Sequence, residues 1–114
     1  SSAASDVYKR QVPNGSVYAA VKGAISSLTR QCAVELGQKG IRVNAVAPGP
    51  IPTPGTMRVV DEEGWEKRLQ RSPLGRLSTV EGVAQVVLFL ASDASDCVNG
   101  DVLFADGGRS ISAM

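Results

Sequence analysis

Tyr18 and Lys22 are the two side chains of this sequence whose types and spacing suit proton transfer. They stand in the segment YAAVK, residues 18–22. On a helix, residues four apart share a face, so the lysine ammonium can lie near the phenol. An unperturbed tyrosine titrates near ~10, and a neighbouring cation lowers that pKa toward the range in which the hydroxyl gives and takes a proton. The alternative is a surface tyrosine that happens to precede a lysine.

Several other chemistries are made less probable by the residue types present. These 114 residues contain no histidine, which excludes the Ser-His-Asp and Cys-His nucleophile systems and removes the commonest metal ligand. Cys32 and Cys97 are far apart in sequence, which favours two reduced structural thiols over a disulfide or redox pair. The acidic run at 61–63 is typical of a helix start rather than of a metal site. We therefore expect no metal.

Composition indicates a soluble globular protein. Hydrophobic residues make up 43% and charged residues 20% of the chain, and the net charge is +1. The basic and acidic side chains are spread along the sequence, so no patch for nucleic acid or an anionic membrane is expected. The longest apolar run, VVLFLA at 86–91, is too short to span a bilayer. A cytoplasmic protein is the default expectation.

Hydrophobic spacing predicts alternating helices and strands. Apolar residues at three- and four-residue steps predict a long helix over 17–39, ended by the glycine of QKG. The branched segment 41–48 predicts a buried strand, and the residues at 49–56, rich in proline and glycine, predict a loop. Residues 61–71 predict a helix interrupted at Gly64.

The remaining segments complete a recognisable order of elements. Ser78 followed by Glu81 predicts a capping box at the start of a helix that runs to about residue 93, and NGDVLFADGG at 99–108 predicts a turn, a short strand and a glycine-rich exit. Helix, strand, loop, helix and strand predict an α/β fold, namely the C-terminal part of a doubly wound Rossmann-like parallel sheet. Because these residues include no glycine-rich phosphate turn, we expect a fragment of such a sheet.

Four motifs occur together and in order between Val12 and Gly108. They are YAAVK, IRVNAVAPGPIPT, PLGRLSTVEGVAQVVLFLASD and VNGDVLFADGG. In this order and spacing they resemble the C-terminal half of a classical short-chain dehydrogenase/reductase. The resemblance implies an enzyme that moves hydride between the nicotinamide of NAD or NADP and a carbonyl or hydroxyl carbon.

The resemblance also implies roles for particular residues. Tyr18 is the proton donor in reduction and the acceptor in oxidation, and Lys22 holds the nicotinamide ribose hydroxyls and tunes Tyr18. In the following loop, Pro48 and Gly49 shape the turn, while the Ile51 backbone and the Thr53 hydroxyl meet the nicotinamide carboxamide side of the cofactor. Taken singly, the proline and glycine could instead simply end a strand, and Thr53 could be a turn residue.

The family further implies a mobile segment and an oligomer. Residues 54–72 correspond to a loop and helix that close over substrate. The apolar residues of this segment either line a substrate pocket or pack locally; they are Met57, Val59, Val60, Trp65 and Leu69. Relatives pair the helix that carries the tyrosine and lysine across a subunit interface, so a homodimer or homotetramer is expected for the full-length protein.

The first residues raise a separate question. Ser5 lies thirteen positions before Tyr18, the distance at which the family places a catalytic serine. However, SSAASDVYKRQ lacks the apolar strand that should lead into that serine. A transposon adapter used in preparing DNA sequencing libraries encodes all eleven residues without a mismatch. We therefore expect residues 1–11 to be a non-native leader, with 12–114 forming the C-terminal half of one domain that is inactive alone.

Three functions remain open at this point. The first is an alcohol dehydrogenase or ketoreductase acting on a small keto or hydroxyl substrate, of the 3-oxoacyl carrier-protein reductase branch or a sugar or steroid dehydrogenase type. The second is a dienoyl-coenzyme A reductase relative, suggested by PGPI followed by TPG. The third is a non-catalytic fold relative that acts as a binding protein, which the intact Tyr18 and Lys22 disfavour.

Overall fold

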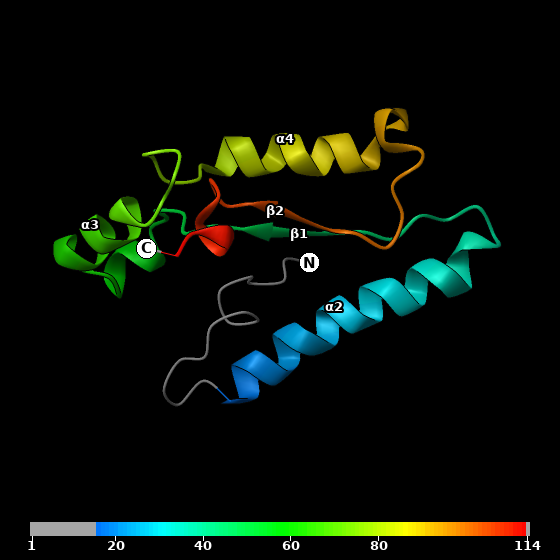
Figure 1. Cartoon of the computed structure of the whole chain (residues 1–114), viewed down its shortest axis with the longest axis horizontal. Helices are drawn as coiled ribbons and strands as arrows, with labels where there is room; N and C mark the ends of the chain where they lie inside the picture. The colour runs from blue at the N-terminus through cyan, green and yellow to red at the C-terminus, as the bar shows by residue number, and fades with distance from the viewer. Residues whose placement is uncertain (1–15, 114) are drawn as a thin grey trace.

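The long helix α2 is the first element of the part of the chain that the structure describes (Figure 1). A computed structural model of the protein describes residues 16–113, with the side chain of Tyr18 left out. The expectations for Ser5 and for the leader at 1–11 therefore fall outside the described residues. The elements are α2 (Ser16–Gly37), β1 (Ala45–Pro48), the 3-10 helix η1 (Thr56–Arg58), α3 (Glu62–Gln70), α4 (Val80–Ala91), η2 (Asp93–Ser95), β2 (Val102–Ala105) and η3 (Arg109–Ile111).

Helix α2 confirms the prediction made from apolar spacing, and it ends at Gly37 instead of Lys39. The chain leaves the helix through Gly40, which has a φ of 76°. The Ile41 N–H donates to the Leu36 carbonyl at 3.2 Å, so the last turn is closed by a bond that passes over this glycine. A left-handed residue at this place is the usual way to satisfy the last carbonyls of a helix.

Strands β1 and β2 form a parallel pair, in register from Ala45 opposite Val102 to Pro48 opposite Ala105. The predicted strand at 41–48 is shorter than expected because the Val43 backbone and the Asn44 side chain bond to residues 98–101 that precede β2. The Val43 N–H donates to Asn99 Oδ1 at 3.0 Å, and Asn44 Nδ2 donates to the Val98 carbonyl at 2.9 Å. The strand starts only after these contacts.

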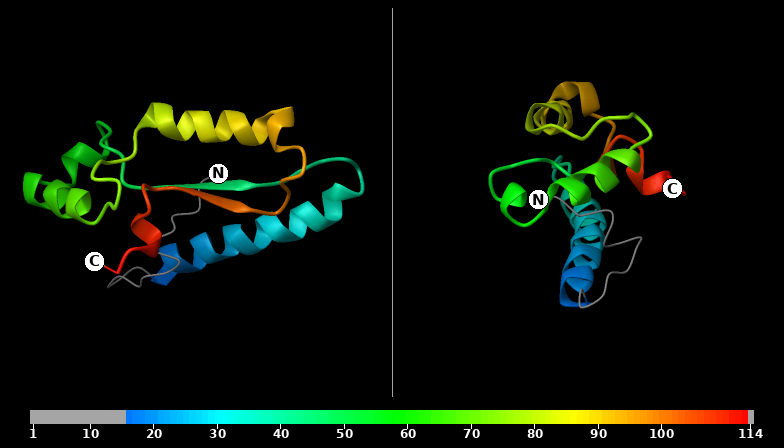
Figure 2. Two further views of the ribbon diagram at one scale, coloured as in Figure 1. Left: turned by 45° about the horizontal axis from the view of Figure 1, so that its top comes forward. Right: turned by 90° about the vertical axis from the view of Figure 1, so that its left-hand side faces the viewer.

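The two long helices lie on opposite sides of the strand pair. Figures 1 and 2 show α4 on one face of the sheet and α2 on the other. The buried apolar residues are alanines and one valine: Ala45, Val46 and Ala47 of β1 and Ala33 of α2. A parallel pair joined through a helix, with helices on both faces, confirms the α/β fold class. In the part of the chain that the structure covers, no helix is both long enough and apolar enough to cross a membrane.

Helix α3 runs through Gly64 without a break, so the predicted interruption is wrong. Asp61 is the N-cap, and its carboxylate accepts a hydrogen bond from the Gly64 N–H at 2.7 Å. Gly64 is thus the third residue of the first turn, where its N–H has no partner within the helix. The bond between Asp61 and the Gly64 N–H helps to offset the low helix propensity of this glycine.

The predicted capping box of Ser78 and Glu81 is also wrong. The N-cap of α4 is Thr79, whose side chain accepts from the Gly82 N–H at 2.9 Å. The Ser78 hydroxyl instead donates to the Ala105 carbonyl at 3.0 Å, 27 residues away in sequence. Ser78 and Thr79 were equally suited to the cap by residue type. The Ser78 hydroxyl bonds to the end of β2, so Thr79 is the cap.

Candidate functional site

The carboxyl end of β1 leads directly into the candidate cofactor residues. Pro48 is the last residue of the strand, and the Gly49 N–H donates to the Ala105 carbonyl at 3.1 Å. A Cβ atom at Gly49 would lie 2.9 Å from both Asp106 Cα and Ser78 Oγ. Real Cβ contacts of this kind essentially never occur, so the chain needs glycine where the three segments meet.

Replacing Gly49 with alanine is expected to lower the free energy of unfolding by about 1–3 kcal/mol, because the added methyl group overpacks against backbone that cannot turn away. Urea denaturation of the 114-residue chain measures the change. Gly23→Ala is the matched control, since a Cβ at Gly23 meets nothing within 4 Å and alanine has the higher helix propensity. A Gly49→Ala variant as stable as the Gly23→Ala variant would refute this reading.

Ile51 and Thr53 belong to a turn organised by Thr56. The Thr56 hydroxyl lies 2.9 Å from the Ile51 carbonyl and 3.1 Å from the Thr53 carbonyl, and it accepts from the Thr53 N–H at 2.8 Å. The Thr53 hydroxyl in turn accepts from the Thr56 N–H at 3.2 Å. Thr56 was missed in the sequence, although the repeated threonine of TPGT was a signal for such a turn.

The same turn leaves donors available for a ligand. The Thr56 hydroxyl has one hydrogen, which it can donate to the Ile51 or the Thr53 carbonyl. The Thr53 hydroxyl, 3.1 Å from the Thr56 hydroxyl, can therefore donate its own hydrogen either to the Thr56 oxygen or to another group. Within residues 16–113, the Ile51 N–H has no hydrogen-bond acceptor. One backbone donor and one hydroxyl donor, two residues apart, can meet an amide carbonyl.

Tyr18 and Lys22 both lie in the first half of α2. Figures 1 and 2 show that this half of the helix points toward the end of the molecule at which β1 ends. The Lys22 side chain is half-buried and makes contacts of its own. The fold therefore brings the start of α2 and the 48–53 segment to one end of the sheet, whereas the position of the phenol falls outside the described atoms.

Asp106 is a further polar residue at this end of the sheet that the sequence analysis did not single out. Its side chain is buried, with 5% exposed, and its carboxylate accepts from the Gly108 N–H at 3.0 Å and from the Ser110 N–H at 2.8 Å. These bonds hold the chain as it turns away from β2. The Asp-Gly-Gly sequence was the signal, because aspartate commonly bonds backbone two residues on.

A pocket of about 520 Å³ lies between residues 73–79, the start of α4 and the end of β2. Its walls combine apolar side chains, such as Leu77 and Phe104, with the hydroxyls of Ser78 and Thr79. None of the candidate residues with a described side chain lines it. It therefore lies beside the candidate site and is separate from it.

The segment predicted to close over substrate contains η1 and α3. Met57, Val59 and Val60 line a pocket of about 390 Å³, together with charged residues. The other two residues predicted for an apolar pocket, Trp65 and Leu69, are not part of this lining. The pocket is thus less apolar than the sequence suggested.

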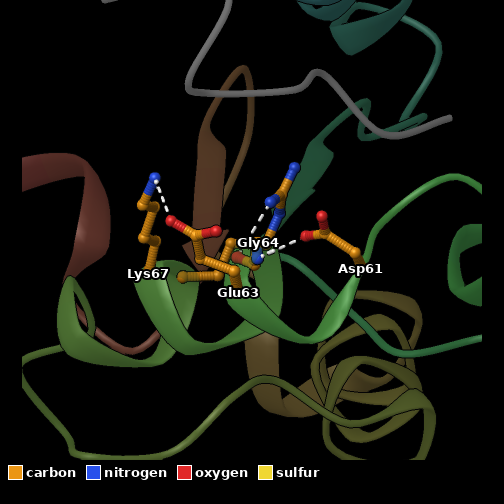
Figure 3. A network of polar contacts seen from close by, with 5 residues as sticks. Asp61, Glu63, Gly64 and Lys67 are labelled. Atoms are coloured by element: carbon orange, nitrogen blue, oxygen red, sulfur yellow. Dashed lines mark hydrogen bonds and ion pairs between the residues drawn. The ribbon is translucent and has the colours of Figure 1, made fainter.

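Two polar contacts lie along the first turns of α3. Figure 3 shows the Lys67 ammonium reaching Glu63 and the Asp61 carboxylate reaching the backbone of Gly64. The Lys67 to Glu63 distance is 3.2 Å, and both side chains are largely exposed, so this pair contributes little stability.

Metal and cysteine chemistry can be assessed for the described residues. Among residues 16–113, no three histidine, cysteine, aspartate or glutamate side chains group as a metal site would require. Cys32 is half-buried and Cys97 is exposed, and both are free thiols in this structure.

Comparison with known proteins identifies the family. A family model described as Enoyl-(Acyl carrier protein) reductase matches residues 2–110. The fold superposes on a short-chain type dehydrogenase/reductase from Mycobacterium ulcerans with a TM-score of 0.88 and 32% sequence identity, covering 96% of this chain and 40% of that one. The chain belongs to the short-chain dehydrogenase/reductase family.

Two curated relatives show the breadth of this short-chain dehydrogenase/reductase family. The chain is 50% identical over 96 residues to the 3-oxoacyl-[acyl-carrier-protein] reductase FabG of Thermotoga maritima, which covers 84% of the chain and 39% of the relative. It is 48% identical over 94 residues to a probable 2,4-dienoyl-CoA reductase of Bacillus subtilis, covering 80% of the chain and 37% of the relative. The chain thus spans about two-fifths of the length of these relatives.

Proposed function

We propose that this chain supplies the proton-transfer and nicotinamide-facing half of an NAD(P)-dependent oxidoreductase. The enzyme would interconvert a carbonyl and a hydroxyl group of a small molecule. The observation that supports the proposal is that the half of α2 that contains Tyr18 and Lys22 points toward the end of the molecule at which β1 ends and the 48–53 turn begins. Ligands of open α/β sheets bind outside the carboxyl ends of the strands.

Tyr18 and Lys22 would divide the chemistry between them. Tyr18 gives a proton to the carbonyl oxygen during reduction and takes it from the hydroxyl during oxidation. Lys22, one helical turn further on, favours the phenolate form of Tyr18 by its positive charge and holds ribose hydroxyls through its ammonium hydrogens. When bound, NAD(P) supplies and accepts the hydride at its nicotinamide ring.

The residues of the 48–53 segment fit such a cofactor. The Ile51 N–H is an available donor, and the Thr53 hydroxyl can release its hydrogen to a ligand, so the two can hold an amide group. Gly49 keeps the turn close to Asp106, where any side chain would push the segment out of place. These residues bind and orient; Tyr18 and Lys22 move the proton.

The same proposal extends to the organisation of the protein. Residues 12–114 would be the C-terminal half of one domain, preceded by a non-native leader at 1–11, and the enzyme would be a cytoplasmic homodimer or homotetramer. Val21 is 51% and Leu28 60% exposed on α2, so this helix has apolar surface that a second subunit or the rest of the domain would cover. Exposed apolar residues grouped on one helix are typical of an interface.

Two other functions are distinguished by experiment. The identity of 48% with a probable 2,4-dienoyl-CoA reductase favours testing a dienoyl thioester beside the keto compounds. A non-catalytic binding protein would reduce neither.

A chimeric enzyme tests the proposal. Residues 12–114 replace the matching C-terminal residues of the Thermotoga maritima FabG, and oxidation of NADH and NADPH is followed with a panel of keto compounds and a dienoyl thioester. Activity toward keto compounds is expected. A soluble, cofactor-binding chimera with no activity would count against the proposal, and a preference for the dienoyl thioester would favour the second candidate.

Changing Lys22 to methionine in this chimera is expected to lower kcat/KM for the cofactor by about 10²-fold, because the ammonium that holds the ribose and favours the phenolate is lost. Steady-state kinetics with varied NADPH measure the effect. Lys39→Met, at an exposed position beyond the end of α2, is the control. Equal effects of the two variants would remove Lys22 from the site.

A further inference from the structure

The pocket between η1 and α3 has two arginines among its lining residues. Arg58 and Arg68 line it together with Asp61 and the apolar residues Met57, Val59 and Val60. The volume is about 390 Å³, enough for a small molecule or for one end of a larger one. Positive charge beside apolar surface suits a ligand that has a negatively charged group and an apolar part.

Arg68 is held in place by its own helix. Its Nη1 donates to the Gly64 carbonyl at 3.0 Å, and its Cζ lies 5.6 Å from the centre of the Trp65 ring. The Gly64 carbonyl holds one edge of the guanidinium, and the Trp65 ring covers one of its faces. Because arginine carries five N–H donors in a rigid fork, several donors remain for a ligand.

Gly64 keeps this wall of the pocket open. A Cβ atom there would lie 2.8 Å from Val60 Cγ1 and 3.3 Å from Arg68 Nη1. Any larger residue would displace the valine or the guanidinium. The glycine that is unfavourable for a helix thus permits the close approach of Arg68 to the first turn.

The charges around the pocket favour a negative ligand. Two positive groups face one negative group, and the Asp61 carboxylate is already bound to the Gly64 N–H at 2.7 Å. Lys67, the next basic residue on α3, is paired with Glu63 and does not line the pocket. Arg58 and Arg68 can therefore meet a carboxylate or phosphate as charge-assisted donors.

We propose that this pocket binds the carboxylate or phosphate of the substrate, so that the enzyme prefers anionic keto compounds over neutral ones. The identity of the ligand as substrate rests on the proposed function; the binding of an anion by the pocket does not. Arg58 and Arg68 would be specificity residues that hold the unreactive end of the substrate.

The first test uses the 114-residue chain and its single tryptophan. The Arg68 guanidinium stacks over the Trp65 ring, so an anion that binds this guanidinium should change the fluorescence of Trp65. Glutarate and propyl phosphate are titrated in parallel with glutaramide, the neutral match of glutarate. We expect a saturable fluorescence change with at least one of the two anions and no change with glutaramide. The anion with the lower Kd indicates whether the pocket prefers a carboxylate or a phosphate. Identical responses to glutarate and glutaramide would overturn the proposal.

Substitutions assign the effect to the pocket. Arg58→Gln and Arg68→Gln are each expected to weaken anion binding about tenfold by calorimetry, and Arg68→Lys should retain part of it because the charge remains. Lys67→Gln is the control, since it removes the same charge from the same helix outside the pocket. Far-ultraviolet circular dichroism checks that each variant is folded. Equal weakening by Lys67→Gln would mean nonspecific attraction and would overturn the site.

The second test uses the chimeric enzyme with keto acids of increasing chain length and their methyl esters. The ratio of kcat/KM for acid over ester is expected to exceed one and to fall about tenfold in Arg58→Gln, with Lys67→Gln leaving the ratio unchanged. An active enzyme that does not distinguish acid from ester would overturn the substrate assignment. Inactivity toward every keto compound would instead refute the proposed function, while anion binding by the chain would stand.

Discussion

Replacing Tyr18 with phenylalanine is expected to lower kcat of the chimeric enzyme by roughly 10²–10⁴-fold, the usual contribution of a general acid or base. Phenylalanine keeps the ring and its packing and removes only the oxygen that carries the proton. The KM for the cofactor should change little, because Lys22 and the 48–53 turn are retained. Steady-state kinetics in both directions, with keto compound and with alcohol, measure the loss.

The chain contains its own control for this change. Tyr8 is the only other tyrosine of the sequence, and Tyr8→Phe removes the same atom outside the segment 12–114 to which we assign the function. The control variant is made in a chimera that retains residues 1–11. A Tyr18→Phe enzyme that keeps more than about a tenth of the original kcat would contradict the role of the phenol.

Replacing Arg42 with alanine is expected to lower the free energy of unfolding by about 2–3 kcal/mol, the order of losing hydrogen bonds from a charged donor to half-buried carbonyls. Arg42 Nη2 donates to the carbonyls of Leu90 and Ser92 at 2.9 and 3.2 Å, and Nη1 donates to the Val98 carbonyl at 3.0 Å. One side chain thus caps the carboxyl end of α4, where a positive charge is also favoured by the helix dipole, and ties it to the segment before β2.

Urea denaturation of the chain measures this loss, with Arg42→Lys and Arg30→Ala alongside. Lysine should recover only part of the stability, because one ammonium cannot reproduce the planar fork. Arg30 is exposed on α2, so its removal should change stability by less than about 0.5 kcal/mol. If Arg42→Ala were no more destabilising than Arg30→Ala, the cap would be energetically unimportant.

Local patterns accounted for the elements and failed at their ends. The apolar repeat of α2 depends on residues three and four apart, which lie together in any helix, so the helix was predicted nearly to its last residue. The cap of α4 and the length of β1 depend on partners far along the chain. Ser78 bonds to the Ala105 carbonyl, and Val43 and Asn44 bond to Asn99 and Val98. Residue type and spacing along the chain do not predict these contacts.

The candidate site divides in the same way. The order of motifs predicted Tyr18, Lys22 and the 48–53 loop, because each motif lies within a few consecutive residues. The part played by Thr56 and the close contact of Gly49 with Asp106 and Ser78 required the path of the turn and the position of β2. The predicted apolar pocket in the 54–72 segment was revised for the same reason, since only the folded segment places Arg58 and Arg68 on one cavity.

The sequence alone predicted the α/β class and the family and supplied the residues that we propose for proton transfer, because these depend on periodicity and on short motifs along the chain. The tertiary structure decided which hydroxyl caps α4, how Arg42 joins α4 to the segment before β2, and which charges share a pocket. The Ser78 and Arg42 contacts join residues 27 and up to 56 positions apart, and the bond from Asn99 to the Ala33 carbonyl spans 66 positions. Such distant groups meet only when burial of the small apolar residues of β1 and α2 brings the helices onto the two faces of the sheet.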